Sequence, residues 1–138
     1  MAVTDMTIVY VEDDPLSRQV MQLTAEHVLH IENLVIFDDS TDIVARIRSL
    51  EKRPGIIFLD VQVSPYDGFE MVKMIRQGPD LREVKGVAIT ASVVSAVEKL
   101  RASGFDGMIN KPINPMTLLD LIERIIRGEQ IWESEYKE

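Results

Sequence analysis

The chain has 138 residues, 46% of them hydrophobic and 28% charged, a balance that fits one soluble globular domain and excludes a disordered or membrane-embedded chain. Its formal net charge of −8 argues against nucleic acid as a direct partner, because that binding relies on Lys and Arg neutralising phosphates. Cysteine is absent, which excludes disulfides and thiolate metal sites and suits a reducing compartment.

The N-terminal segment, MAVTDMTIVYVEDD, contains one short apolar run that ends in acidic residues. The run is too short for a signal peptide or a transmembrane helix, so we expect a cytoplasmic protein without membrane contact. The acidic residues are Glu12, Asp13 and Asp14, and Pro15 follows them directly. Because Asp then Pro is typical of a helix N-cap and first helical position, we assign Asp14 to capping and leave it out of the candidate site.

Short apolar runs alternate along the chain with segments of helical period. The runs cover residues 7–11, 34–37, 56–59, 86–89 and 107–110. They are too continuous for strands with one solvated face, so we predict buried strands of a parallel sheet. Between them, apolar residues at i, i+4 and i+7 predict amphipathic helices on two sets of residues: Leu16, Val20 and Leu23, then Ile43, Ile47 and Leu50.

Five strand-then-helix units follow one another without a Pro/Ser/Gly-rich linker or an internal repeat. This order predicts an α/β fold with one doubly wound parallel sheet of five strands, covered on both faces by five helices. We assign residues 1–128 to this domain. The acidic segment 129–138 is predicted to be a C-terminal helical extension or tail, because Trp132 and Tyr136 are spaced i, i+4.

Polar residues stand where the predicted strands end, the place at which doubly wound sheets bind ligands. They are Glu12 and Asp13, Asp60, Thr90, and Lys111. Asp60 is the most informative, because it follows four apolar residues, and a carboxylate there must be solvated, paired or used. Such an oxygen cluster fits Mg²⁺. The ion and Lys111 would stabilise a transferring phosphoryl group, with a carboxylate between them as its acceptor.

Several segments together resemble the markers of response regulator receiver domains. They are IVYVEDDP, IIFLD, YDG, IT followed by a small residue, and NKP, in the order and at the intervals of that family, over roughly residues 5 to 128. The resemblance implies a flavodoxin-like, CheY-like fold with strand order 2-1-3-4-5. It also implies a stand-alone, single-domain response regulator.

The resemblance implies a role for each matching carboxylate. Asp60 resembles the phosphoacceptor, and Asp13 resembles a direct magnesium ligand. Glu12 resembles the carboxylate that acts mainly through metal-bound water. The backbone carbonyl of Gln62 corresponds to a third protein ligand of the ion.

Two further matches concern the response to phosphorylation. Thr90 resembles the switch hydroxyl and Lys111 the invariant amine, whose bond to Pro112 is cis in the family. The chain also departs from the family pattern. Val63 and Ser64 stand where most receivers have Met-Pro, and Met108 stands where the family usually carries the Tyr or Phe that reorients on activation.

The function implied by the resemblance is a phosphorylation-controlled signalling receiver, not an enzyme beyond its own phosphoryl transfer and autodephosphorylation. A histidine kinase or histidine phosphotransfer protein would supply the phosphoryl group to Asp60 with Mg²⁺. A downstream protein would bind the face made by the fourth helix, fifth strand and fifth helix of a monomer or weak dimer.

Two alternatives stay open. Met108 and the altered loop favour a receiver-like scaffold that binds partners without phosphorylation. An aspartate-nucleophile phosphohydrolase is the enzymatic alternative, but Gln62 stands where those enzymes place a second aspartate.

Overall fold

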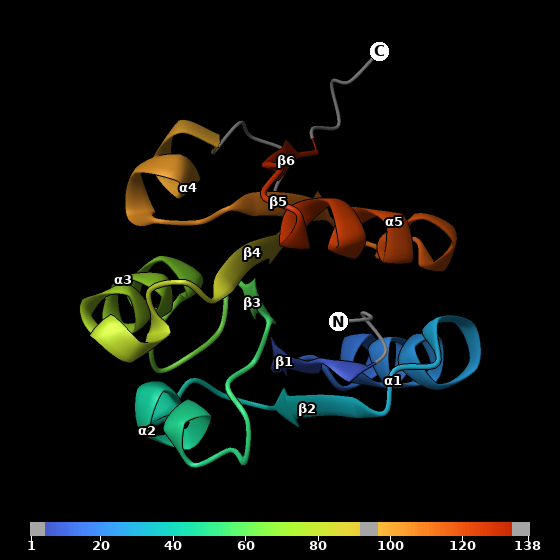
Figure 1. The fold of residues 1–138 in the computed structure, drawn as a ribbon, viewed down its shortest axis with the longest axis horizontal. Helices are drawn as coiled ribbons and strands as arrows, with labels where there is room; N and C mark the ends of the chain where they lie inside the picture. The colour runs from blue at the N-terminus through green and yellow to red at the C-terminus, as the bar shows by residue number, and fades with distance from the viewer. Residues whose placement is uncertain (1–4, 92–96, 134–138) are drawn as a thin grey trace.

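The computed structural model describes residues 5–91 and 97–133 and shows one sheet with helices on both faces (Figure 1). Six parallel strands form the sheet in the order β2-β1-β3-β4-β5-β6. The strands are β1 (Thr7–Val11), β2 (Asn33–Phe37), β3 (Ile56–Asp60), β4 (Lys85–Thr90), β5 (Gly107–Asn110) and β6 (Ile131–Trp132). The helices are α1 (Pro15–Thr24), the π-helix η2 (Ala25–Leu29), α2 (Ile43–Arg48), α3 (Gly68–Gln77), the 3-10 turn η3 (Pro79–Leu81), α4 (Val97–Ser103) and α5 (Pro115–Ile126).

The doubly wound α/β prediction is confirmed, with strand order 2-1-3-4-5 extended by a sixth strand. The helices α1 and α5 cover one face of the sheet, and α2, α3 and α4 cover the other (Figure 1). Each face encloses its own apolar core, in which Tyr10 and Phe58 point to the α1 and α5 side while Val9 and Leu59 point to the opposite side. The central strands are buried on both faces, which explains their continuous apolar runs.

Capping residues mark the ends of several helices, and the predicted cap at Asp14 is confirmed. The Asp14 carboxylate accepts a hydrogen bond from the Ser17 backbone N–H at 2.9 Å, so it caps α1. Asp67 and Glu70 form a capping box at the start of α3, so the Asp67 carboxylate serves to begin this helix. Gly104 follows α4 with φ +109°, a conformation that favours glycine.

The apolar stripe of α1 does not face the core, contrary to the expectation for an amphipathic helix. Leu16, Val20 and Leu23 are 66%, 40% and 48% exposed. The buried side of the helix carries Met21 and Thr24 instead. The helix itself is confirmed, but its position on the sheet turns three large apolar side chains toward the surface.

The prediction of a helical extension is wrong for residues 131 and 132, which form β6. The helix α5 ends at Ile126, and Gly128 adopts φ +104°, which turns the chain back toward the sheet. Ile131 and Trp132 then pair with Gly107 and Met108 of β5. The helical spacing of Trp132 and Tyr136 is therefore not realised at Trp132, and Tyr136 lies outside the described residues.

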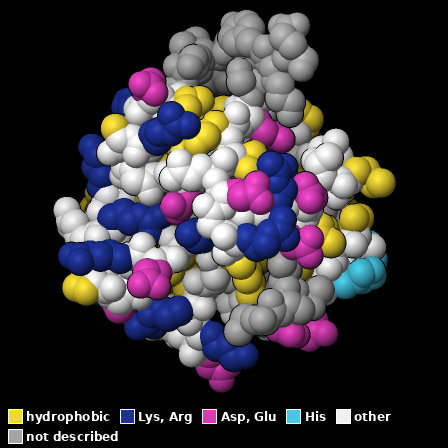
Figure 2. Space-filling model, turned by 45° about the horizontal axis from the view of Figure 1, so that its top comes forward, with side chains coloured by type: hydrophobic (Ala, Val, Ile, Leu, Met, Phe, Trp, Pro, Cys, Tyr) yellow, Lys and Arg dark blue, Asp and Glu magenta, His cyan; other side chains and the backbone are white. Residues whose placement is uncertain are grey.

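Acidic and basic side chains are interspersed on the face shown in Figure 2. Ion pairs on the surface of the molecule include Arg48 with Asp80 at 2.9 Å and Arg124 with Glu129 at 3.0 Å. Within the described ranges, no helix combines the length and apolar character that crossing a bilayer requires.

Candidate functional site

The carboxyl ends of β1, β3, β4 and β5 bring the predicted site residues together. Strand register explains this, because Asp60 ends β3 opposite Ile89 of β4, and Thr90 ends β4 opposite Asn110 of β5. Lys111 follows Asn110, and its backbone N–H donates to the Thr90 carbonyl at 2.9 Å. The chain adds β2 on one side of β1 and β3 on the other, so the strand order reverses at β1 and this edge is the topological switch point of the sheet.

Asp60 is only 5% exposed, and both of its carboxylate oxygens are engaged. Its Oδ1 accepts a hydrogen bond from the Gln62 backbone N–H at 3.0 Å. Its Oδ2 accepts one from Lys111 Nζ at 3.1 Å. The carboxylate that the sequence placed after four apolar residues is therefore held by one cation and one backbone amide.

Glu12 is fully buried and shares the same cation. Lys111 Nζ lies 2.8 Å from Glu12 Oε1. The Tyr10 hydroxyl donates to that oxygen at 2.8 Å, and the Asp14 backbone N–H donates to Oε2 at 3.2 Å. Glu12 thus has three donors, which satisfy a carboxylate that has no contact with solvent.

Tyr10 is a site residue that the sequence analysis missed. Its ring is fully buried, and burial together with Glu12 raises the pKa of its hydroxyl, so the group stays a neutral donor. The spacing of Tyr10 and Glu12 could have indicated their contact, because residues two apart on a strand point to the same face. An apolar run that contains one tyrosine two residues before a buried acid indicates this pairing.

Crowding shifts the acid–base properties of the cluster. Burial and the neighbouring Glu12 raise the pKa of Asp60 to about 6. Burial also opposes ionisation of Glu12, yet the Asp60 carboxyl, Lys111 and Tyr10 hold the pKa of Glu12 below its usual value. The pKa of Lys111 is raised, because the attraction of both carboxylates outweighs its partial burial. The cluster therefore keeps Glu12 and Lys111 charged and makes ionisation of Asp60 unfavourable.

A metal ion would find oxygen ligands at this edge. Carboxylate oxygens of Glu12, Asp13 and Asp60 lie within 4.8 Å of one another, and Asp13 is exposed to solvent. An all-oxygen set with one open, solvated member suits Mg²⁺, which retains several waters when bound to proteins. The donor chemistry therefore fits this ion, whereas ligation by the Gln62 carbonyl stays a prediction.

The loop after Asp60, where the sequence departs from the receiver pattern, is held by Ser40. Ser40 is fully buried, and its hydroxyl accepts from the Tyr66 backbone N–H at 2.6 Å. Its own N–H donates to the Ser64 carbonyl at 3.1 Å. The peptide bond between Ser64 and Pro65 is cis. The bond between Lys111 and Pro112 is also cis, as the family resemblance implied. The loop after Asp60 is thus well anchored by Ser40 although Val63 and Ser64 replace the Met-Pro of the family pattern.

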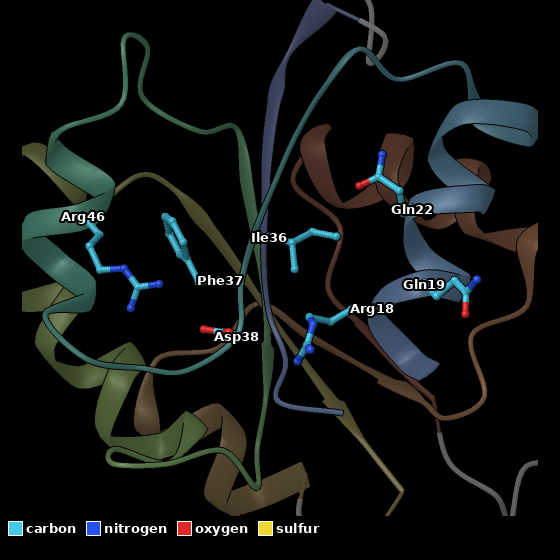
Figure 3. Close-up of a pocket in the computed structure, with 7 residues that line it drawn as sticks. All are labelled: Arg18, Gln19, Gln22, Ile36, Phe37, Asp38 and Arg46. Carbon is cyan, nitrogen blue, oxygen red and sulfur yellow. The ribbon is translucent and has the colours of Figure 1, made fainter. Parts of the chain in front are cut away.

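Two pockets flank this edge and differ in character. The larger one, of about 480 Å³, lies between α1 and α2 at the end of β2 (Figure 3). Its two arginines are already engaged, since Arg18 donates to the Glu12 carbonyl at 3.0 Å and Arg46 donates to the Asp39 carboxylate at 2.8 Å. The other pocket, of about 350 Å³, is mostly apolar and borders Lys111, with Leu16 and Val20 of α1 on its rim.

Comparisons with known proteins agree on one family. A family model described as the response regulator receiver domain matches residues 8–123. The chain is 28% identical to the nitrate/nitrite response regulator protein homolog of Haemophilus influenzae over 141 residues, which cover 96% of this chain and 62% of that protein. The chain therefore spans less than two thirds of the length of this relative.

Solved structures show the same fold. The receiver domain of the sensor histidine kinase PA1611 from Pseudomonas aeruginosa, with a magnesium ion in its active site cleft, is 22% identical with a TM-score of 0.77, covering 89% of this chain and 98% of that chain. The chemotaxis response regulator CheY4 of Vibrio cholerae is 25% identical with a TM-score of 0.75, covering 87% of this chain and 98% of that chain.

Replacing Asp60 by Asn should stabilise the metal-free protein at pH 7. The folded-state pKa of about 6 lies above the unfolded value near 3.9, so ionisation of Asp60 lowers the free energy of unfolding as pH rises between these values. We expect Asp60→Asn to gain about 1–3 kcal/mol at pH 7 and to lose this advantage near pH 4.

Urea unfolding in a chelator at both pH values measures this difference. The exposed Asp38, replaced by Asn, is the matched control and should change little at either pH. A destabilised Asp60→Asn at pH 7 would contradict the proposed charge crowding.

Replacing Tyr10 by Phe should weaken the fold, because the ring stays buried while Glu12 loses a donor that solvent cannot replace. We expect the free energy of unfolding to fall by about 1–3 kcal/mol. Thermal or urea unfolding measures it, with the exposed Tyr66→Phe as control. Equal stability of the two variants would show that the Tyr10 hydroxyl is not needed.

Proposed function

The chain belongs to the response regulator receiver domains of two-component signalling, and from this membership we propose that it is controlled by phosphorylation of Asp60. The single observation that carries the proposal is the placement of Lys111 Nζ, 3.1 Å from Asp60 Oδ2, beside a cluster of carboxylate oxygens. This arrangement provides an acceptor oxygen, a cation for the incoming group and ligands for a divalent ion on one sheet edge.

Mg²⁺ is the cofactor that the cluster supports best. A magnesium ion occupies the active site cleft of the Pseudomonas receiver domain, and the carboxylates here offer the same class of ligand. We propose that Asp13 binds the ion directly, Glu12 acts mainly through metal-bound water, and the Gln62 carbonyl completes the protein ligands. When bound, the ion neutralises charge on the transferring phosphoryl oxygens.

The chemical step proposed is the transfer of a phosphoryl group from a phosphohistidine. The P–N bond of the donor breaks and its electron pair stays on the imidazole, while a new P–O bond forms to Asp60. Lys111 would hold one phosphoryl oxygen, which matches its present contacts with both Asp60 and Glu12. Thr90, buried at the end of the neighbouring strand, would turn its hydroxyl toward another.

Receiver domains are signalling proteins that interact with histidine kinases and downstream targets. For this chain we propose a histidine kinase or histidine phosphotransfer protein as phosphodonor. The exposed Leu16, Val20 and Leu23 on α1, with the apolar pocket next to Lys111, support a docking face beside Asp60. The proposed output face is α4, β5 and α5, on a monomer or weak dimer.

The alternatives fit these contacts less well. A scaffold without phosphorylation does not need Lys111 placed between two buried carboxylates. A phosphohydrolase needs a second acid two residues after the nucleophile, and Gln62 contacts Asp60 through its backbone N–H instead. We therefore propose only self-catalysed phosphoryl transfer and dephosphorylation, in a signalling protein.

Incubation with a small phosphodonor and Mg²⁺ should add one acid-labile phosphoryl group to the wild-type chain and none to Asp60→Asn. Intact-mass spectrometry measures the product, and Asp38→Asn should react like wild type. If Asp60→Asn gains a phosphoryl group at the wild-type rate, the assignment of the acceptor is wrong.

Val20→Glu should slow phosphoryl transfer from a phosphohistidine protein while leaving transfer from a small phosphodonor unchanged. A charge in an apolar contact must be desolvated on docking, and we expect about a tenfold lower rate. The exposed Gln77→Glu on α3, on the opposite face of the sheet, is the control. Equal slowing with both donors would place the defect in the site rather than in docking.

A further inference from the structure

The outer edge of β5 is occupied by the chain's own C-terminal segment. Ile131 and Trp132 pair with Gly107 and Met108, and β6 lies beside β5 at the end of the sheet (Figure 1). The Glu133 backbone N–H donates to the Met108 carbonyl at 3.0 Å. In return, the Glu133 carboxylate accepts from the Asn110 backbone N–H at 3.0 Å. We refer to residues 131–133 as the strap.

The strap carries the only tryptophan of the chain, Trp132, which pairs with β5 and whose ring is contacted from α4. The Trp132 ring packs against the apolar core that contains Met108 and Leu100. The Arg101 guanidinium lies 5.0 Å from the ring centroid, a cation–π contact from α4. This ring therefore stands next to Met108, the position at which the receiver pattern usually has an aromatic residue.

A glycine in β5 permits this close approach. A Cβ atom at position 107 would lie 2.8 Å from the Ile131 carbonyl oxygen, well inside normal contact distance. Any side chain at this position would push the strap off the strand. Gly107 thus leaves room for an extended segment to pair with the outer edge of β5.

Two features of the strap oppose its docking. It comprises a two-residue strand at a sheet edge, and its three residues are partly exposed. Within the described part of the chain, the buried Trp132 indole N–H has no hydrogen-bond partner. An unsatisfied buried donor opposes docking of the ring. A change at β5 that removes one of the strap's hydrogen bonds would therefore favour the free strap.

One hydrogen bond and one peptide bond connect the strap to Lys111 of the proposed phosphorylation site. Asn110, whose N–H donates to Glu133, directly precedes Lys111, which contacts Asp60 at 3.1 Å. The Lys111 backbone N–H donates to Thr90. A backbone shift at Lys111 or Thr90 that accompanies phosphorylation of Asp60 would move the Asn110 N–H that holds the Glu133 carboxylate.

We propose that the edge of β5 is a strand-binding surface, that the strap occupies it in the resting protein, and that phosphorylation of Asp60 releases the strap. The phosphoryl group adds negative charge at the strand end where Glu133 is bound, and it draws Lys111 toward itself. Release exposes the Trp132 ring and frees the β5 edge on the α4–β5–α5 face. This inference rests on the proposed function, since it requires a modified Asp60.

Trp132 reports directly on the strap, because no other tryptophan contributes to the emission. The experiment adds beryllofluoride and Mg²⁺ to the full chain as a mimic of the phosphoryl group. We expect a red shift of the Trp132 emission and at least tenfold faster hydrogen exchange of the Glu133 amide. Neither change should occur in Asp60→Asn.

Gly107→Ala provides a release that does not involve Asp60. The added Cβ should free the strap, so the emission is already shifted and beryllofluoride shifts it little further. Gly86→Ala at the start of β4 is the matched control, since its Cβ would meet neighbours at 3.4 Å or more. Glu133→Gln keeps the strap residue but removes its charge, and it should reduce the response to beryllofluoride even if Gly107→Ala fails to fold.

Fluorine NMR of bound beryllofluoride distinguishes failure of the strap proposal from failure of the proposed function. If the mimic binds but the Trp132 emission and the hydrogen exchange of the Glu133 amide do not change, release of the strap is refuted and the proposed function stands. Absence of bound mimic in the presence of Mg²⁺ would overturn the proposed function and the strap with it.

Discussion

One ammonium group bridges two poorly solvated carboxylates at the centre of the sheet edge, and its single positive charge offsets only one of them. Lys111 Nζ lies 2.8 Å from Glu12 and 3.1 Å from Asp60, and both acids are buried. Without this cation, the acids would repel each other in a site that water cannot screen. Lys111 is held by its own backbone bond to Thr90, so the charge balance of the site depends on how β5 pairs with β4.

The same strand ends connect the candidate site to two surfaces. On one face of the sheet, α1 presents exposed apolar side chains next to the pocket that borders Lys111. Beyond β4, β5 carries Lys111 at its end and binds the strap along its outer edge. The proposed donor face on α1 and the strap on β5 therefore both adjoin the same end of the sheet. The parallel sheet makes this possible, because all its strands deliver their carboxyl ends to one edge.

Most of the fold was predictable because the parallel strands are buried on both faces. Runs such as residues 56–59 therefore stand out in the sequence, and Asp60 stands out as the charge that ends one. The orientation of α1 was not predictable, because helical periodicity identifies a stripe without saying which side meets the sheet. Tyr10 was missed because an isolated hydroxyl in an apolar run shows no partner. The strap was missed because two residues are too few for a strand pattern.

Gly107 and the strap have a consequence for the behaviour of the chain in a concentrated solution. A strand at the end of a sheet exposes unpaired backbone groups, which other chains can pair with. Here β6 takes up the outer side of β5, and the Glu133 carboxylate satisfies the Asn110 N–H at the point where the strand pairing ends. The C-terminal segment therefore protects this edge from intermolecular β-pairing. If phosphorylation of Asp60 frees this edge, as proposed, the chain is more prone to aggregate for as long as Asp60 stays phosphorylated.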